Sequence, residues 1–266
     1  NAIKENIKRD LRKYSVAGIV PEILDLKYLF LETDSKIYYN TSLAPNSIMV
    51  SSTVMNNINK LADSAELNKY GARFKYSKFL KVLDQSHESI TSNITTVEMR
   101  RDLRLATDQF AEYAIDFGNQ FHITDMEGYN LRSTAFRVLD IVNEVYLFDI
   151  PNTDKKTGRL GLFSLDSPGS TTPIIERQNV GLVNYEKGRI TLNPINITSG
   201  KEKDKQQIME ISVVPESNDV IGLQDLYLQL DTSNVEMVVD EIASGADPSG
   251  STYTVTTSYK QRKIVR

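Results

Sequence analysis

The chain has 266 residues, of which 40% are hydrophobic and 25% are charged, a composition typical of globular proteins and a length sufficient for two domains. Its formal net charge of -4, from 31 basic and 35 acidic residues, indicates neither a nucleic acid nor an anionic membrane as partner. The absence of cysteine excludes disulfides, thiolate metal sites and cysteine nucleophiles, and no apolar run reaches the ~20 residues that span a bilayer.

The N-terminal residues predict an amphipathic helix. Ile3, Ile7 and Leu11 recur every four positions among basic side chains, which indicates about three helical turns rather than a signal peptide. Because the sequence starts at Asn1 without a methionine, we expect the chain to be processed or cut from a longer protein.

Residues 22–40, EILDLKYLFLETDSKIYYN, predict a hairpin of two strands around a four-residue turn. The even positions from 24 to 30 are apolar, as expected for the half-buried face of a strand. The odd face is apolar at both ends and includes Leu29 and Leu31. These two leucines pack either inside this subunit or against another chain.

Two further helices and a strand are predicted between residues 50 and 105. Apolar residues from Val50 to Ala65 follow the helical period. Gly71 breaks this pattern, and Ser77 is a candidate N-cap for a short second helix. From Asn93 the period changes to two with apolar odd positions, which predicts a strand with one buried side.

The predicted fold class is α+β, with a domain boundary between residues 105 and 106. Residues 1–105 run helix, strand, strand, helix, helix, strand, an order that predicts a small sheet backed by helices. Residues 106–266 contain short β-rich runs separated by Gly, Pro, Asn and Asp, which predict a mainly-β domain of one or two subdomains. Within it we expect a hairpin with its tip at residues 186–188 and a longer loop between paired strands in residues 150–163.

The sequence predicts no catalytic, cofactor-binding or metal-binding residues. His87 and His122 stand in unrelated contexts, and neither has the second histidine of a zinc-binding helix. The chain also lacks a nucleophile elbow, a Walker loop and a dinucleotide-binding glycine motif. We therefore predict that the protein is not an enzyme.

Two weaker interpretations concern acidic residues. Asp149, Asn152 and Asp154 offer oxygen ligands for calcium, but their spacing is not that of an EF-hand and two lysines follow, so a solvated turn is favoured. A hydrolase with two acidic residues is a further alternative, but in a chain with 35 acids such pairs occur by chance. The pairs considered are Asp116 with Asp125 and Asp231 with Asp240.

Basic residues cluster on the predicted strand that starts near Asn93. Arg100, Arg101 and Arg104 alternate with acidic residues. This alternation favours a salt-bridged outer face over a phosphate-binding patch.

Three stretches resemble a known family over essentially the whole chain. They are VAGIVPEILDLKYLFLETDSKIYYN, FKYSKFLKVLDQSHESITSNITTVEMRRDL and PESNDVIGLQDLYLQLD, the last followed by the basic end SYKQRKIVR. The succession resembles the C-terminal half of the baseplate wedge subunit, the product of gene six, of T-even-type contractile-tailed bacteriophages. The first part resembles, more loosely, the J-like wedge proteins of other contractile injection systems.

This resemblance implies a structural protein of the virion, located in the tail baseplate and assembled in the host cytoplasm. It implies pairing with itself as a homodimer, contacts with other wedge subunits, and a ring of wedges around the central hub that rearranges when the sheath contracts. It implies no enzymatic activity and no cofactor. The alternative function is a receptor- or carbohydrate-binding β-rich domain of a tail or surface structure, for which a chain without tryptophan gives little support.

We expect the assembly role to depend on self-complementary surfaces, one for a dimer and a second that joins dimers into a closed ring. Aromatic and aliphatic anchors supply most of the binding energy of such surfaces. The candidate residues are Leu29, Leu31, Tyr38, Tyr39, Tyr253, Val255, Tyr259 and Ile264.

Overall fold

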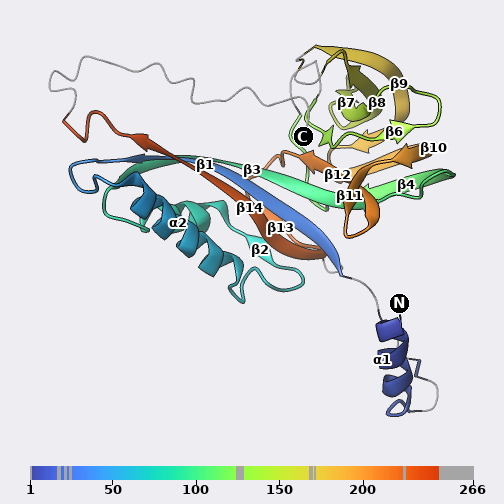
Figure 1. Ribbon diagram of the computed structural model, residues 1–266, viewed down its shortest axis with the longest axis horizontal. Coiled ribbons are helices and arrows are strands. Elements are labelled where there is room, and N and C mark those ends of the chain that lie inside the picture. The colour runs from blue at the N-terminus through green and yellow to red at the C-terminus, as the bar shows by residue number, and fades with distance from the viewer. Residues whose placement is uncertain are drawn as a thin grey trace.

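The computed structural model (Figure 1) describes residues 2–16, 19–20, 23, 26–123, 129–167, 170, 172–223 and 226–245. This part of the chain is mainly β, with three helices. The helices are α1 (Ala2–Arg12), α2 (Ser47–Ala62) and α3 (Tyr76–Asp84). None of the helices in these ranges is both long and apolar enough to cross a membrane.

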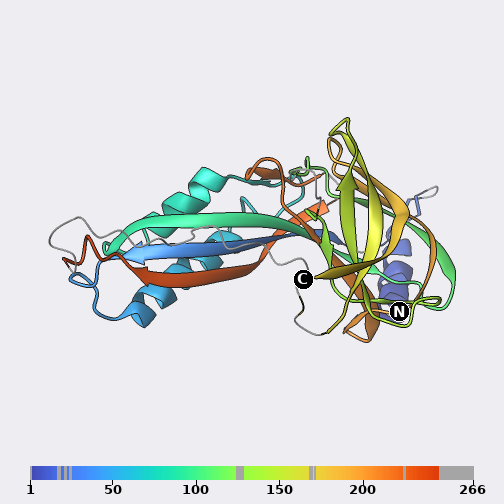
Figure 2. The ribbon, with the colours of Figure 1, turned by 90° about the horizontal axis from the view of Figure 1, so that it is seen from above.

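The first sheet combines strands from distant parts of the chain. Its central strand β1 (Lys27–Tyr39) pairs antiparallel with β3 (Ile90–Arg104) and parallel with β14 (Leu226–Val239). Figure 2 shows these three long strands side by side. Beyond β3 the sheet continues with β12 (Gln206–Val213) and β11 (Lys201–Lys203), and β5 (Arg132–Ser133) also pairs with β12.

One face of the first sheet is covered by α2 and α3 (Figure 1). The odd positions of β1 point to this face, and every second residue from Leu29 to Tyr39 is buried. Opposite them α2 contributes a buried apolar stripe at helical spacing, as the sequence predicts. The fully buried side chains of this core are Leu29, Leu31, Ile37, Val50, Val54, Phe79 and Leu83.

The predicted hairpin at residues 22–40 is wrong, because residues 27–39 form one continuous strand. Two of the polar residues taken for a turn, Thr33 and Ser35, are buried and bonded to neighbouring strands. The Thr33 hydroxyl lies 2.9 Å from that of Ser233 on β14, and the Thr95 hydroxyl on β3 donates to that of Ser35 at 2.9 Å. The register of pairing between β1 and β14 shifts between Leu31 and Thr33, and β1 continues through this point without a turn.

Helix α3 begins one residue earlier than its predicted cap. Its N-cap position is Lys75 rather than Ser77, and the Lys75 side chain makes no capping bond. Instead the carboxylate of Asp219, distant in sequence, accepts from the backbone N–H of Tyr76 at 2.8 Å. A long-range contact thus replaces the local cap.

The second sheet contains the predicted hairpins of the C-terminal half. The tip at residues 186–188 joins β9 to β10, and residues 152–156 join β7 to β8. Its strands are β4 (Phe110–Asp116), β10 (Arg189–Ser199), β9 (Pro173–Asn184), β8 (Thr157–Leu165) and β7 (Val145–Pro151), with β6 (Arg137–Val138) beside β10. A separate pair is made by β2 (Arg73–Phe74) and β13 (Val220–Ile221).

The boundary predicted at residue 105 does not separate the two sheets. β12 and β14 follow that boundary in the sequence, yet both belong to the first sheet. Figure 1 accordingly shows two lobes, the helix-backed first sheet and the curled second sheet, between which the chain crosses more than once. The prediction of helices on a sheet followed by mainly β structure agrees with the fold only in this coarser form.

We expect Leu31→Ala to lower the free energy of unfolding by about 2–5 kcal/mol, because it removes a fully buried side chain from the core under α2. Leu182→Ala is the matched control, since that leucine is 58% exposed and its loss is expected to cost less than about 0.5 kcal/mol. Denaturant unfolding followed by circular dichroism measures both. Equal losses would contradict the placement of Leu31 in the core.

Candidate functional site on the open face of the first sheet

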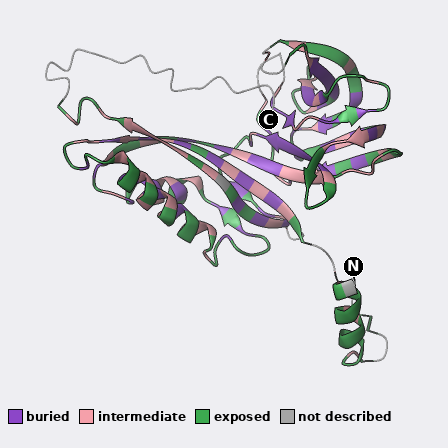
Figure 3. Cartoon of the chain, viewed as in Figure 1, coloured by how far each residue is buried: buried purple, intermediate pink, exposed green. Residues whose placement is uncertain are grey.

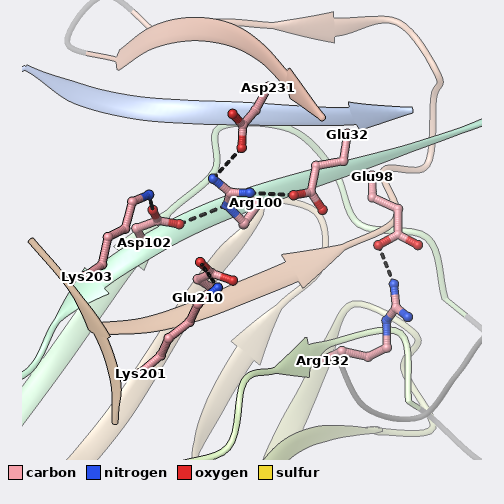
Figure 4. A network of polar contacts seen from close by, with 9 residues as sticks. All are labelled: Glu32, Glu98, Arg100, Asp102, Arg132, Lys201, Lys203, Glu210 and Asp231. Atoms are coloured by element: carbon pink, nitrogen blue, oxygen red, sulfur yellow. Dashed lines mark hydrogen bonds and ion pairs between the residues drawn. The ribbon is translucent and has the colours of Figure 1, made fainter. Parts of the chain in front are cut away.

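The face of the first sheet opposite α2 and α3, called here the open face, carries a cluster of charged side chains (Figure 4). The even positions of β1 and β3 point to it. The Arg100 cluster consists of Arg100, Glu32, Asp102, Asp231 and Lys203. Its members come from β1, β3, β11 and β14, so the cluster joins strands that are far apart in the sequence.

Arg100 is the centre of this cluster and is 4% exposed. Its Nη1 lies 2.5 Å from Glu32 Oε1, its Nε 2.9 Å from Asp102 Oδ1 and its Nη2 2.7 Å from Asp231 Oδ2. The guanidinium also lies over the ring of Phe30, with its central carbon 4.3 Å from the ring centroid. One side chain therefore ties together β3, β1 and β14.

The charge of Arg100 is stabilised by its partners. Burial alone would lower the pKa of its guanidinium, but the nearby carboxylates of Asp102, Glu32 and Asp231 outweigh that effect and raise the pKa. Removing the cation would leave three carboxylates facing one another. The cluster therefore depends on Arg100 more than on any single acid.

Two further ion pairs lie beside the Arg100 cluster (Figure 4). Arg132 on β5 pairs with Glu98 on β3, and Lys201 on β11 pairs with Glu210 on β12 at 2.7 Å. Next to Arg132, the Ser133 hydroxyl accepts from the backbone N–H of Leu147 on β7 at 2.8 Å. Hence the open face is polar where the first sheet meets the second.

The arrangement favours a structural role for these carboxylates. General acid-base catalysis needs a group that is poised to give or take a proton, whereas the carboxylates of the Arg100 cluster and of the two pairs beside it are held by cations. The alternation seen in the sequence correctly indicated salt bridges, since Asp102 pairs with Arg100. It did not indicate that Arg100 is buried.

Of the acidic pairs considered for a hydrolase, Asp231 and Asp240 have separate partners and form no common site. Asp231 binds Arg100 at 2.7 Å, whereas Asp240 accepts from the Thr91 hydroxyl at 2.6 Å. Asp116 is held by Arg189, and Asp125 lies outside the described residues.

The candidate calcium ligands have other partners. Asp149 is buried and accepts from the backbone N–H of Leu131 at 2.8 Å and from the Tyr185 hydroxyl at 2.7 Å. Burial and the adjacent charge of Asp149 raise the pKa of Tyr185. Asp154 instead accepts from backbone N–H groups of its own loop, as a solvated turn does. Over the ranges that the structure describes, no three acidic or histidine side chains form a metal-binding group.

The two histidines have separate local contacts. Nδ1 of His87 lies 2.8 Å from the Ser89 hydroxyl. Nδ1 of His122 lies 3.0 Å from Glu216 on the surface. The two contacts share no residue, so they do not combine into a Ser-His-Glu triad.

The structure places Leu29 and Leu31 inside the subunit, one of the two alternatives that the sequence left open. Both are 0% exposed and Tyr39 is 6% exposed, because all three point to the helix-covered face. The prediction that these three residues lie on a self-association surface is therefore wrong, because they belong to the core. Tyr38 points to the open face and is half-buried, with Lys36 Nζ 5.6 Å from its ring centroid.

The remaining candidates of the self-association surface lie outside the described residues. They are Tyr253, Val255, Tyr259 and Ile264. Their role stays a prediction.

The comparisons with known proteins give two matches. The family model described as "Baseplate structural protein gp6, C-terminal domain III" matches residues 27–102. The baseplate wedge protein gp6 of Enterobacteria phage T4 is 24% identical over 254 residues, which cover 84% of this chain and 38% of that protein. The chain thus spans well under half the length of this relative. Both matches confirm the resemblance to the T-even-type wedge subunit.

We expect Arg100→Leu to lower the free energy of unfolding by about 3–5 kcal/mol, because it leaves three partly buried carboxylates without the buried cation that they share. Arg177→Leu is the matched control: its pair with Asp140 is exposed and longer, at 3.4 Å, so its loss is expected to stay within about 1 kcal/mol. Thermal and denaturant unfolding measure both. Similar losses would show that the Arg100 cluster does not hold the strands.

Acid titration tests the cross-strand pair of Asp116 and Arg189, whose Nε–Oδ1 distance is 2.5 Å. The hydrogen bond from Arg189 lowers the pKa of Asp116 in the folded state, so the unfolded state, with an Asp pKa of about 3.9, binds more protons in this range. The pair's stabilisation is therefore present above about pH 4 and is lost as the pH falls through the folded pKa.

We expect Arg189→Gln to be less stable than the wild type at pH 6, and the difference to shrink as the pH falls towards 3. Chemical unfolding at a series of pH values measures this difference. A gap that stays constant with pH would refute the assignment.

Proposed function

Because the sequence is gp6-like, with residues 27–102 matching domain III of the baseplate protein, we propose that this protein is a structural subunit of the baseplate of a contractile phage tail. It acts by binding other subunits rather than by catalysis, and it is located in the virion after assembly in the host cytoplasm. The observation that carries this proposal is the match itself, because its residues form one continuous stretch of the helix-covered first sheet, from β1 through α2 and α3 to β3.

The first sheet is stabilised on both faces, which suits a subunit that has to resist mechanical force. A packed apolar core holds one face, and the Arg100 cluster ties β1, β3 and β14 together on the other. Packed interiors transmit strain because they have few voids. The sheet is therefore a stiff arm between its far end and the second lobe.

We place the self-association surface on the exposed end of the open face. The open-face patch consists of Tyr38, Ile94 and Val238, on three adjacent strands. Ile94 is 38% exposed, and Tyr38 is half-buried. An isologous contact between two such patches buries an aromatic anchor against its symmetry mate.

Charges around the open-face patch fit a two-fold contact. Lys36 and Glu236 lie directly opposite each other on β1 and β14 beside the patch. When two copies meet face to face about a two-fold axis, the lysine of one approaches the glutamate of the other. Complementary rim charges of this kind fix register more than they add affinity.

Helix α1 supplies a second contact surface, for another wedge subunit. Its apolar residues Ile3, Ile7 and Leu11 are 70%, 48% and 46% exposed, and Figure 1 shows the helix apart from both lobes. Because the rest of the helix is mainly basic, the groove that fits it is apolar with an acidic rim. A ring of dimers that rearranges on sheath contraction needs at least two such distinct surfaces.

We expect the wild-type protein to form dimers at micromolar concentration, and Tyr38→Asp combined with Ile94→Asp to shift it to monomers. Mass measurement in solution over a concentration series gives the distribution, and thermal unfolding checks that the variant is folded. Leu182→Asp is the control, because it adds an acid at an exposed leucine of the second sheet. A wild type that stays monomeric at high micromolar concentration contradicts self-association, and a dimer that tolerates both substitutions contradicts the choice of surface.

A further inference from the structure

The end of α2, the loop that follows it, β2 and the start of α3 surround a pocket of about 290 Å³, called here the basic pocket. It lies next to β2, at one end of the helix layer (Figure 1). Its apolar floor consists of Leu67 and Phe74, which are buried, and Leu61, which is half-buried. The wall at Gly71 is open, since a side chain there would meet no atom within 4 Å. The volume is close to the lower end of the range for ligand pockets.

The lining of the basic pocket carries an excess of positive charge. Among the described residues that line it, four are basic, Lys69, Arg73, Lys75 and Lys78, and one is acidic, Glu66. Lys78 pairs with Glu66. Lys69, Arg73 and Lys75 are exposed, and none of the three has an ion pair within the described ranges. Because the chain as a whole has a net charge of -4, its composition does not explain this local excess.

Glu66 shows how a carboxylate interacts with these cations. The hydrogen bond and the charge of Lys78 lower the pKa of Glu66, and the charges of Lys69 and Lys75 act in the same direction. One carboxylate is therefore stabilised by three lysines. Since a single acid faces four cations in the described lining, the pocket has positive charge left for a further carboxylate.

Two of these cations lie where the helix itself disfavours them. Lys75 is at the N-cap position of α3 without a capping bond from its side chain, and Lys78 is in the first turn, which contains no acidic residue. The N-terminal end of a helix carries a partial positive charge, so that acids stabilise it and lysines do not. Residues that oppose local preference in this way are expected where a site needs them.

An acidic peptide fits the basic pocket better than a free phosphate or a nucleic acid. Carboxylates form charge-assisted hydrogen bonds with lysine and arginine, and an apolar side chain next to them in a peptide would cover the apolar floor, which a hydrated phosphate would leave in contact with water. The ring of Phe74 is 1% exposed, so it offers no platform for the base stacking by which single-stranded nucleic acids bind.

We propose that the basic pocket binds an acidic segment of another protein, whose carboxylates pair with Lys69, Arg73 and Lys75 while an adjacent apolar side chain packs on the floor. The pocket shares no residue with the open-face patch or with α1, so it is a third contact site. The inference does not rest on the proposed function, because the chemistry of the pocket is the same whichever protein supplies the segment.

Fluorescence polarisation with labelled peptides tests the charge preference. The probe is the peptide GDELEDG and the control is its neutral counterpart GNQLQNG, both measured with the intact chain at low ionic strength. We expect the acidic peptide to bind at least about tenfold more tightly, because only its carboxylates pair with the cations, and to bind more weakly as salt is added. Equal binding of the two peptides, or binding of neither, would overturn the proposal.

Substitutions locate the binding in the pocket. Lys69→Gln combined with Lys75→Gln is expected to weaken binding of the acidic peptide about tenfold, the sum of two lost charge pairs. The matched control is Lys60→Gln combined with Lys81→Gln, which removes the same charge from exposed lysines of α2 and α3 outside the lining and is expected to change binding less than about twofold. Equal weakening in both variants would assign the binding to general attraction and overturn the proposal.

Thermal unfolding separates a binding defect from a folding defect. The melting temperature of the pocket variant is expected to stay within about 2 °C of the wild type, because neither lysine loses an ion pair of the described structure. A larger fall would give these lysines a structural role and overturn the proposal.

Competition distinguishes the chemical class of the ligand. Inorganic phosphate, a single-stranded oligonucleotide and the unlabelled acidic peptide are titrated separately against the labelled peptide. We expect the unlabelled peptide to displace the probe at the lowest concentration. Displacement by phosphate or by the oligonucleotide at a lower concentration would assign the pocket to that ligand and overturn the proposal.

Discussion

The structure depends on one guanidinium that faces three carboxylates. Arg100 lies on β3, and its partners Glu32 and Asp231 lie on β1 and β14, two neighbouring strands from opposite ends of the sequence. A hydrophobic core on the other face gives non-directional attraction, whereas these ion pairs require particular atoms to meet. Their geometry is therefore suited to fixing the register of the three strands.

The two faces of the first sheet are stabilised by different interactions, and this explains how the sheet can extend away from the second lobe. The apolar side chains of β1 are covered by α2 and α3, so the helix-covered face needs no partner chain. On the open face the Arg100 cluster and the open-face patch around Tyr38 and Ile94 lie at different positions along the strands. The contacts that hold the strands together are thus separate from the residues proposed for self-association.

The sequence predicted those elements whose signal is local. Helix α2 followed from its apolar period, and the tip at residues 186–188 from its turn residues and flanking strands. The failures share one physical cause, because each involved a partner distant in the chain. Thr33 and Ser35 are typical turn residues, but in the fold they are held in a strand by hydrogen bonds to Ser233 and Thr95.

The candidate site was predictable only in outline for the same reason. Charge alternation around Arg100 indicated salt bridges, but nothing local indicated Glu32 or Asp231 as partners, or burial beneath them. The period-two pattern predicted which residues share a face of β1, but it did not predict which of the two faces the helices cover. That choice placed Leu29 in the core and Tyr38 on the open face.

The parallel pairing of β1 with β14 also has a consequence for synthesis on the ribosome. Lys27 pairs with Leu226, so the central strand gains its second neighbour only after the ribosome has made the distant residues of β14. Such non-local pairings fold slowly and leave strand edges exposed meanwhile. Completion of the sheet is thus a late event. Until β14 has been made, the unpaired edge of the nascent sheet is that of β1.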